Sequence, residues 1–222
     1  MSRRSVEILD TTLRDGAQAE GISFSVNDKF QVVETLAALG VRYIEAGNPG
    51  SNPKDRAFYN RFQTEPPKMD QSLLAAFGST RRKHTDVAQD PGLRDLLDAG
   101  TPVIVLFGKV WDLEVRDILK CSHKENIAMI RESVAWCCSQ GREVIFDAEH
   151  YFEASLANEE YALRCLEAAC EGGASVVCLC DTNGASMPEL ISEKTRKAVD
   201  TLTDVRVGIH CHNDAGLAVA NS

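Results

Sequence analysis

Hydrophobic and polar positions alternate along the chain in two different periods. Short, nearly continuous apolar runs are typical of parallel strands buried on both faces, whereas apolar residues three to four positions apart are typical of amphipathic helices. The two patterns follow each other along the whole sequence. They predict about seven βα units, with strands at residues 6–9, 41–46, 73–77, 102–107, 144–146, 176–180 and 205–209.

The segments between these strands carry helix signals. Ser25, followed three residues later by Asp28, is typical of a helix N-cap, and an apolar stripe that includes Phe30 and Val33 ends at Gly40. Further helices are predicted in a segment that ends at residue 98 and at residues 54–62, 125–140, 159–171 and 188–202. Polar loops, among them residues 108–112, separate the elements.

Two α/β architectures fit this alternation: a (β/α)8 TIM barrel and an open, doubly wound sheet. The first βα turn has no Gly-x-Gly-x-x-Gly motif, which removes the main signal of a dinucleotide-binding fold and favours the barrel. A complete barrel takes about 250 residues. We therefore expect a single catalytic barrel domain over residues 1–222, truncated after strand seven, that lacks the last strand, the last helix and any C-terminal regulatory domain.

Composition restricts the class of protein. The chain is 44% hydrophobic with a net charge of −9, which fits a globular domain and argues against binding to nucleic acid or to anionic membranes. No apolar stretch approaches the roughly 18 residues that span a bilayer, and the N-terminus lacks the apolar region of a signal peptide, so we expect a cytoplasmic protein. The eight cysteines form no Cys-x-x-Cys pair and are interpreted as reduced, mostly buried residues.

Polar side chains follow the predicted strands at one end. In a barrel these positions belong to the C-terminal face, where active sites are built. The set comprises Arg14, Asp15, Glu45, Arg81, Arg82, Lys83, Lys109, Glu149, Thr182, Asn183, His210 and His212.

His210 and His212 end the last predicted strand. Their spacing places both imidazoles on the same face of a strand, and neutral imidazole is the commonest metal ligand in proteins. The pair therefore indicates half of a metal site. Cys211, which lies between them, is expected to point to the opposite face and not to ligate.

Five motifs stand at or just after predicted strand ends, at residues 10–18, 45–55, 146–152, 181–184 and 210–214. Together they resemble the DRE-TIM superfamily of acyl-CoA-condensing barrels, which includes the 2-isopropylmalate, homocitrate and citramalate synthases and 3-hydroxy-3-methylglutaryl-CoA lyase. Residues 50–55 (Gly-Ser-Asn-Pro-Lys-Asp) and 147–150 (Asp-Ala-Glu-His) look most like the citramalate synthase branch. Ala185 stands where typical members have a second glycine.

The resemblance implies a divalent metal (Zn, Mn or Mg) with three ligands in this chain, Asp15, His210 and His212. One carboxylate and two imidazoles suit Zn²⁺ or Mn²⁺ and leave positions open for substrate. A further asparagine ligand in the family comes from a region after the last strand. Asn213 is not that residue, and we expect it to support its loop.

The resemblance also implies catalytic roles for Arg14, Glu149 and Glu45, and substrate binding by Arg14, Thr182 and Asn183. Arg14 would stabilise an oxyanion, and the two glutamates are acid–base candidates.

Structural alternatives remain open for several of these residues. The structural alternative for Arg14 is an ion pair with Glu45 or Glu149, and that for Thr182 is capping of the turn that follows it. The basic run at residues 81–83 fits either an anionic group of the substrate or a solvated loop. His123 and His150 are interpreted as local polar residues.

The implied reaction is a condensation of acetyl-CoA, the co-substrate, with pyruvate to give citramalate and CoA, a step of isoleucine and other branched-chain amino-acid biosynthesis. Rival functions are a 2-isopropylmalate or homocitrate synthase that uses another 2-keto acid, a carbon–carbon lyase like 3-hydroxy-3-methylglutaryl-CoA lyase, and a non-catalytic remnant. The resemblance further implies a homodimer of the full-length protein with small-molecule substrates, and the composition predicts no nucleic-acid or membrane partner. Residues 1–222 alone are expected to be inactive or nearly so.

Overall fold

The structure is a computed structural model that describes residues 6–222. The described residues contain seven strands, which pair in the order of the chain from β1 to β7. The pairs β1–β2, β2–β3, β5–β6 and β6–β7 are parallel. The strands are β1 (Leu9–Asp10), β2 (Tyr43–Glu45), β3 (Leu73–Ser79), β4 (Val103–Lys109), β5 (Glu143–Glu149), β6 (Val176–Asp181) and β7 (Arg206–Cys211).

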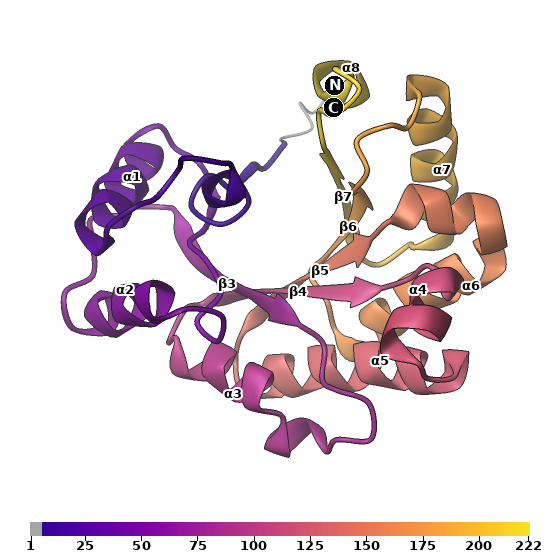
Figure 1. Cartoon of the computed structure of the whole chain (residues 1–222), viewed down its shortest axis with the longest axis horizontal. Helices are drawn as coiled ribbons and strands as arrows, with labels where there is room; N and C mark the ends of the chain where they lie inside the picture. Colours follow the sequence, from indigo (N-terminus) through magenta and orange to yellow (C-terminus); the bar gives the residue numbers. More distant parts are fainter. Residues whose placement is uncertain (1–5) are drawn as a thin grey trace. The chain divides into compact units, whose positions relative to one another are not determined.

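Helices connect successive strands (Figure 1). The connecting helices are α1 (Val26–Ala38), α2 (Pro53–Thr64), α3 (Pro91–Asp98), α4 (Asp112–Glu114), α5 (His123–Ser139), α6 (Tyr151–Gly172) and α7 (Pro188–Thr201). A short helix, α8 (Ala218–Asn221), follows β7. Sequential parallel strands linked by helices are the topology of a (β/α)8 barrel, and a doubly wound sheet would reverse its strand order part-way. The predicted barrel class is confirmed, with seven strands in the described part of the chain.

The chain divides into two compact units. The N-terminal unit comprises Met1–Gly78 and Arg94–Val105, and the C-terminal unit comprises Ser79–Leu93 and Leu106–Ser222. The boundary falls within α3 and β4, so each unit holds part of both elements. Each unit is described by itself below.

In the N-terminal unit, α1 begins where the capping signal predicts. The Ser25 side chain accepts a hydrogen bond from the Asp28 backbone N–H, and the Asp28 carboxylate accepts one from the Ser25 N–H, which completes a capping box. Phe30 on the buried face of α1 packs edge-on against Phe58 of α2, with ring centroids 5.2 Å apart. The apolar stripe therefore fixes α1 against α2.

A buried ion pair joins α1 to α2 in the same unit. Lys29 donates hydrogen bonds to Asp55 Oδ1 at 2.5 Å and to the Ala46 carbonyl at 2.7 Å, and Asp55 Oδ2 accepts the Asn48 N–H at 2.9 Å. Only 4% of Lys29 and 7% of Asp55 is exposed. Gly47 has a φ of +128°, and a Cβ there would collide with the Asp55 carboxylate. The loop after β2 is thus built around this pair.

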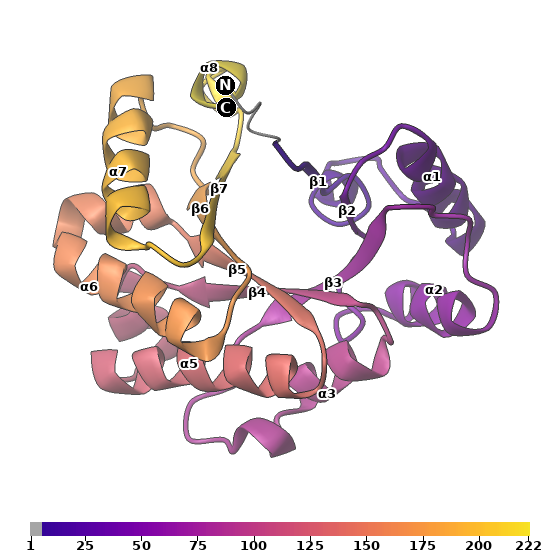
Figure 2. The same ribbon diagram turned by 180° about the vertical axis from the view of Figure 1, so that it is seen from behind.

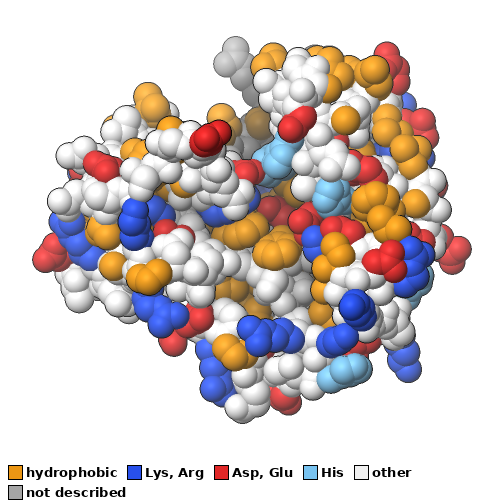
Figure 3. Space-filling view, in the orientation of Figure 1, with side chains coloured by type: hydrophobic (Ala, Val, Ile, Leu, Met, Phe, Trp, Pro, Cys, Tyr) orange, Lys and Arg blue, Asp and Glu red, His pale blue; other side chains and the backbone are white. Residues whose placement is uncertain are grey.

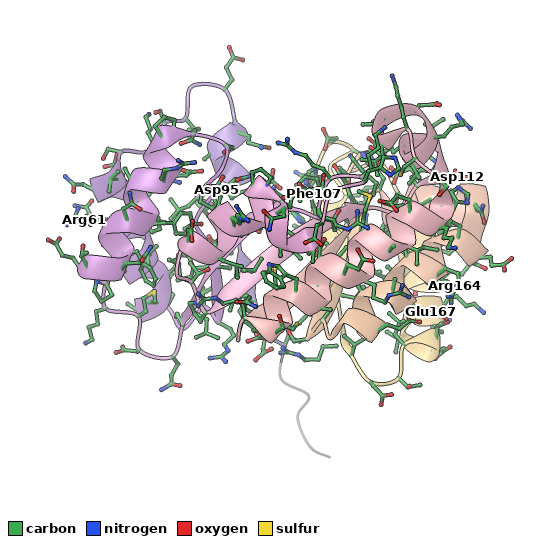
Figure 4. All side chains as sticks on the ribbon, turned by 90° about the horizontal axis from the view of Figure 1, so that it is seen from below. Arg61, Asp95, Phe107, Asp112, Arg164 and Glu167 are labelled. Atoms are coloured by element: carbon green, nitrogen blue, oxygen red, sulfur yellow. The ribbon has the colours of Figure 1, made fainter. Side chains whose placement is uncertain are left out.

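In the C-terminal unit, the long helices α5 and α6 lie side by side (Figure 2). Gly172 allows this close approach, because a Cβ there would lie 2.7 Å from the Arg131 carbonyl oxygen of α5. On the exposed side of α6, Arg164 and Glu167 form an ion pair at 2.6 Å (Figure 4). The inner residues of β5 and β6 are buried, as their apolar runs predict.

Several element boundaries differ from the prediction by one to three residues, and three regions differ in a way that changes the local structure. β1 covers only Leu9–Asp10, α6 begins at Tyr151 rather than at residue 159, and the loop predicted at 108–112 runs into α4 and a π-helical turn, Val115–Leu119. The start of α6 was missed because His150 makes no side-chain cap and Asn158, at φ −156° and ψ 81°, interrupts the helical period.

All eight cysteines are free thiols, as predicted. Within residues 6–222 no helix is long and apolar enough to cross a membrane.

Breaking the buried ion pair should destabilise the fold. Lys29→Met leaves the Asp55 carboxylate buried without its cation, and we expect the free energy of unfolding to fall by about 3–5 kcal/mol. The control is Lys54→Met, which removes an exposed lysine bonded to Ser23 and should cost less than about 0.5 kcal/mol. Chemical denaturation of the two variants checks this, and equal losses would contradict it.

Candidate functional site

The carboxyl ends of β4 to β7 carry the predicted polar residues of the C-terminal unit. Lys109 ends β4, Glu149 ends β5, Thr182 follows β6 and His210 lies near the end of β7. Because parallel neighbours run in the same direction, these ends lie along one edge of the sheet. In barrel enzymes this edge carries the active site.

His210 and His212 converge at the end of β7. Their ring centroids lie 4.9 Å apart at an interplanar angle of 60°, and both side chains are half-buried. The His212 backbone N–H donates a hydrogen bond to the Asp181 carbonyl oxygen, which fixes the backbone of His212 against the end of β6. Burial, with Asp181 and Cys178 nearby, raises the pKa of Cys211 to about 11, so this thiol is protonated at neutral pH. The two imidazoles form the donor pair that the His-x-His spacing predicts.

Asp15, the third predicted ligand, belongs to the N-terminal unit. It lies beside Arg14, and the distance between Arg14 Nη1 and Asp15 Oδ2 is 3.5 Å. Its membership of the ligand set stays a prediction. Asn213 accepts a hydrogen bond from the Ala218 N–H at the start of α8, consistent with the expected support of the loop.

Arg14 is held between a carboxylate and an aromatic ring. Its Nε donates to Glu45 at 2.5 Å, and its guanidinium carbon lies 3.9 Å from the centroid of the Phe77 ring. Glu45 is fully buried at the end of β2, whereas 12% of the Arg14 side chain is exposed. The ion pair considered as an alternative for Arg14 is therefore present. It fixes the direction of the guanidinium, which lines a cavity of about 520 Å³ in the N-terminal unit.

Glu149 pairs with Lys109, a residue that the sequence prediction left outside the catalytic set. Glu149 Oε2 lies 2.6 Å from Lys109 Nζ, which also donates to Glu114 Oε1 at 2.8 Å. Burial acts to lower the pKa of Lys109, but its hydrogen bonds to the two glutamates outweigh burial and raise that pKa. The position of Lys109 at the end of an apolar strand was the available signal. Glu114 gave none, because the π-helical turn after it was not predicted.

Thr182 and Asn183 follow β6, and their side chains contact residues at the start of α6. Thr182 Oγ1 accepts the His150 N–H at 2.9 Å, so its own hydroxyl proton is available to a second acceptor. Asn183 lies near the Glu153 carboxylate and acts to lower its pKa. His150, interpreted from the sequence as a local polar residue, has a φ of +56° and lies 3.8 Å from Glu153 and 3.9 Å from Glu114.

The basic run after β3 divides into a structural and an exposed part. Arg81 is only 5% exposed and pairs with Glu125 and Glu132, both at 2.8 Å. Arg82 and Lys83 are exposed beside a cavity of about 470 Å³ in the C-terminal unit. Figure 3 shows lysine and arginine side chains gathered over this loop. Arg81 thus serves the local fold, and binding of an anion stays a prediction for Arg82 and Lys83.

A family model described as HMGL-like matches residues 5–222. The chain belongs to the HMGL-like family. This confirms the resemblance that the five motifs carry.

Curated relatives of this HMGL-like chain include two kinds of synthase. An (R)-citramalate synthase from Aquifex aeolicus is 50% identical over 219 residues, which cover 98% of this chain and 41% of that protein. A 2-isopropylmalate synthase from Sulfolobus acidocaldarius is 33% identical over 222 residues, which cover 100% of this chain and 54% of that protein. The chain therefore spans about two fifths to one half of the length of these relatives.

Among solved structures, a 3-hydroxy-3-methylglutaryl-CoA (HMG-CoA) lyase from Brucella melitensis superimposes with a TM-score of 0.79 at 18% identity, covering 97% of this chain and 75% of that one. At this identity the likeness shows the fold alone.

His150 should make stability depend on pH. The Glu153 carboxylate is the largest cause of a raised pKa for His150, against burial, and Glu114 and Glu149 add to it; Trp111 supplies the neighbouring ring. A pKa that is higher in the folded state than in the unfolded state means that the fold stabilises the protonated form of His150. The contribution is therefore fully present below the unfolded pKa of about 6.5 and is lost as pH rises through the folded pKa.

We expect His150→Asn, which tolerates the positive φ, to lose more unfolding free energy relative to the wild type at pH 6 than at pH 9. Chemical denaturation at the two pH values measures the difference. An equal deficit at both would show that folding does not raise the pKa of His150.

Proposed function

We propose that the complete protein condenses acetyl-CoA with pyruvate at a divalent metal to give citramalate and CoA. The observation that carries this proposal is the 50% identity to an (R)-citramalate synthase over 98% of the chain, against 33% to a 2-isopropylmalate synthase. The arrangement of charged groups at the strand ends supports it.

The donor set suits the proposed metal. Two converging imidazoles and one carboxylate, from His210, His212 and Asp15, are ligands that Zn²⁺ or Mn²⁺ accepts. When bound, a divalent ion supplies Lewis-acid polarisation of a keto carbonyl.

The chain's own residues account for orientation and charge. Arg14, fixed by Glu45 and Phe77, presents a guanidinium to the negative charge that develops on the keto oxygen. The Thr182 hydroxyl, whose oxygen already accepts the His150 N–H, donates to the substrate carboxylate with Asn183 beside it. These contacts orient the keto acid for attack on one face.

Glu149 is the proposed acid–base residue. Its carboxylate removes a proton from the acetyl methyl of acetyl-CoA, and the resulting carbanion attacks the keto carbon to form the new carbon–carbon bond. The oxygen of that carbonyl then takes up a proton. Water hydrolyses the thioester, which releases CoA as a thiol and leaves citramalate. Glu45, fully buried against Arg14, holds the guanidinium rather than moving this proton.

Profiling of 2-keto acids tests the reaction. The complete protein with acetyl-CoA should release CoA thiol with a kcat/KM for pyruvate at least about tenfold above that for 2-ketoisovalerate or 2-ketoglutarate, since each added methylene is worth about 10- to 200-fold in a fitted pocket. Mass spectrometry should identify citramalate. A preference for the bulkier acids would favour the 2-isopropylmalate or homocitrate reaction, and acetoacetate from 3-hydroxy-3-methylglutaryl-CoA would show a lyase instead.

Metal content tests the ligand set. His212→Ala removes one of the two converging imidazoles, and we expect the complete protein to retain less than about one tenth of the wild-type metal after dialysis, because ligand loss weakens such sites steeply. The control is His84→Asn, which changes an exposed histidine in the same unit and should leave the metal content unchanged. Elemental analysis measures both, and full retention by His212→Ala would refute the assignment.

A further inference from the structure

Lys109 is held both at its backbone and at its side-chain ammonium group. Its backbone carbonyl accepts a hydrogen bond from Asn126 of α5 at 2.8 Å, and Asn126 is fully buried. Its ammonium group lies between two carboxylates, Glu114 Oε1 at 2.8 Å and Glu149 Oε2 at 2.6 Å. Three elements, β4, α4 and β5, therefore meet at one nitrogen, and the lysine has little freedom to turn toward solvent.

The two carboxylates differ in exposure, and the difference separates their roles. Glu114 keeps 8% of its side-chain surface, whereas Glu149 keeps 24% and Lys109 16%. Glu114 is thus enclosed and serves as an anchor for the lysine. Glu149 is held by the same lysine through one oxygen but retains a surface that a reactant can reach.

Lys109 also offsets the negative charge of the carboxylates around it. Three carboxylates, those of Glu114, Glu149 and Glu153, gather around one lysine and His150. Without the ammonium group, Glu114 and Glu149 would face each other across a partly buried space, and like charges there repel. Glu149 would then turn away from its present direction.

We propose that Lys109 is a positioning residue for Glu149, with Glu114 as its anchor, and that it fixes the carboxylate in the direction from which it removes the substrate proton. The proposal rests on the proposed function in that Glu149 is the acid–base residue. Lys109 itself does not contact the substrate. A misplacement of about 1 Å at a reacting group costs up to about 100-fold in rate, so a residue with this role is detectable in kcat.

A double-mutant cycle in the complete protein tests the coupling. Lys109→Met should lower kcat by about 10- to 100-fold while the KM for pyruvate changes less than about threefold, because binding groups are untouched. In the Glu149→Gln background the same substitution should change kcat by less than about twofold, since the residue it positions is already disabled. Lys109→Arg should restore most of the rate. An equal loss of kcat in both backgrounds would show a general structural role and overturn the proposal.

The chain offers a matched control. Lys194 also bridges two glutamates, Glu159 at 2.9 Å and Glu193 at 3.0 Å, and its side chain is 13% exposed, close to the 16% of Lys109. It lies in α7 of the same unit. Lys194→Met should leave kcat and KM unchanged. A loss comparable to that of Lys109→Met would contradict a specific role for Lys109.

A second measurement requires no turnover. Labelling of Glu149 by a carbodiimide and glycine ethyl ester, located by mass spectrometry, should rise at least about threefold in Lys109→Met and stay constant in Lys194→Met, because loss of the ion pair frees the carboxylate. Increased labelling in a protein that turns over no keto acid would uphold the positioning and refute the proposed function. Unchanged labelling in an enzyme that forms citramalate would uphold the proposed function and overturn the positioning role of Lys109.

Discussion

Parallel pairing of consecutive strands is the constraint on which the rest of this structure depends. Each strand runs in the same direction as its neighbour, so the residues that end the strands lie along one edge. In the C-terminal unit this places Lys109, Glu149 and Thr182 at successive strand ends. In the N-terminal unit the parallel pairing of β1 and β2 places Glu45, at the end of β2, close to Arg14, which follows β1. Helical connections of sufficient length make the parallel order possible.

Three cationic side chains near these ends are held by partners rather than by solvent. Arg14 is paired with Glu45, Lys29 with Asp55, and Lys109 with two glutamates. A buried charge without a partner costs several kcal/mol, so each pair restricts the orientation of both members. Fixed charges of this kind act on a reacting group without reorganisation, which is why the same contacts serve both the fold and the proposed catalysis.

Family membership and local chemistry agree in this chain. The HMGL-like family model covers residues 5–222, and the relatives include an (R)-citramalate synthase and a 2-isopropylmalate synthase. Glu149, proposed as the acid–base residue, has a lysine that holds it and an anchor for that lysine. Thr182 was considered either for substrate binding or for its turn, and its oxygen serves the His150 N–H while its proton remains available. The bond joins Thr182 to the start of α6 rather than to its own turn, and substrate binding by Thr182 stays a prediction.

The sequence by itself determined the βα alternation, the capping of α1, the reduced cysteines and the convergence of His210 with His212, because each rests on periodicity or on neighbours within a few residues. The early start of α6, the π-helical turn after α4 and the pairing of Lys109 with Glu114 and Glu149 were decided only by the tertiary structure. These features depend on contacts between separate elements, or on backbone angles such as those of His150 and Asn158 that no local pattern announces. Local signals select the elements, and packing between elements selects which charged side chains meet.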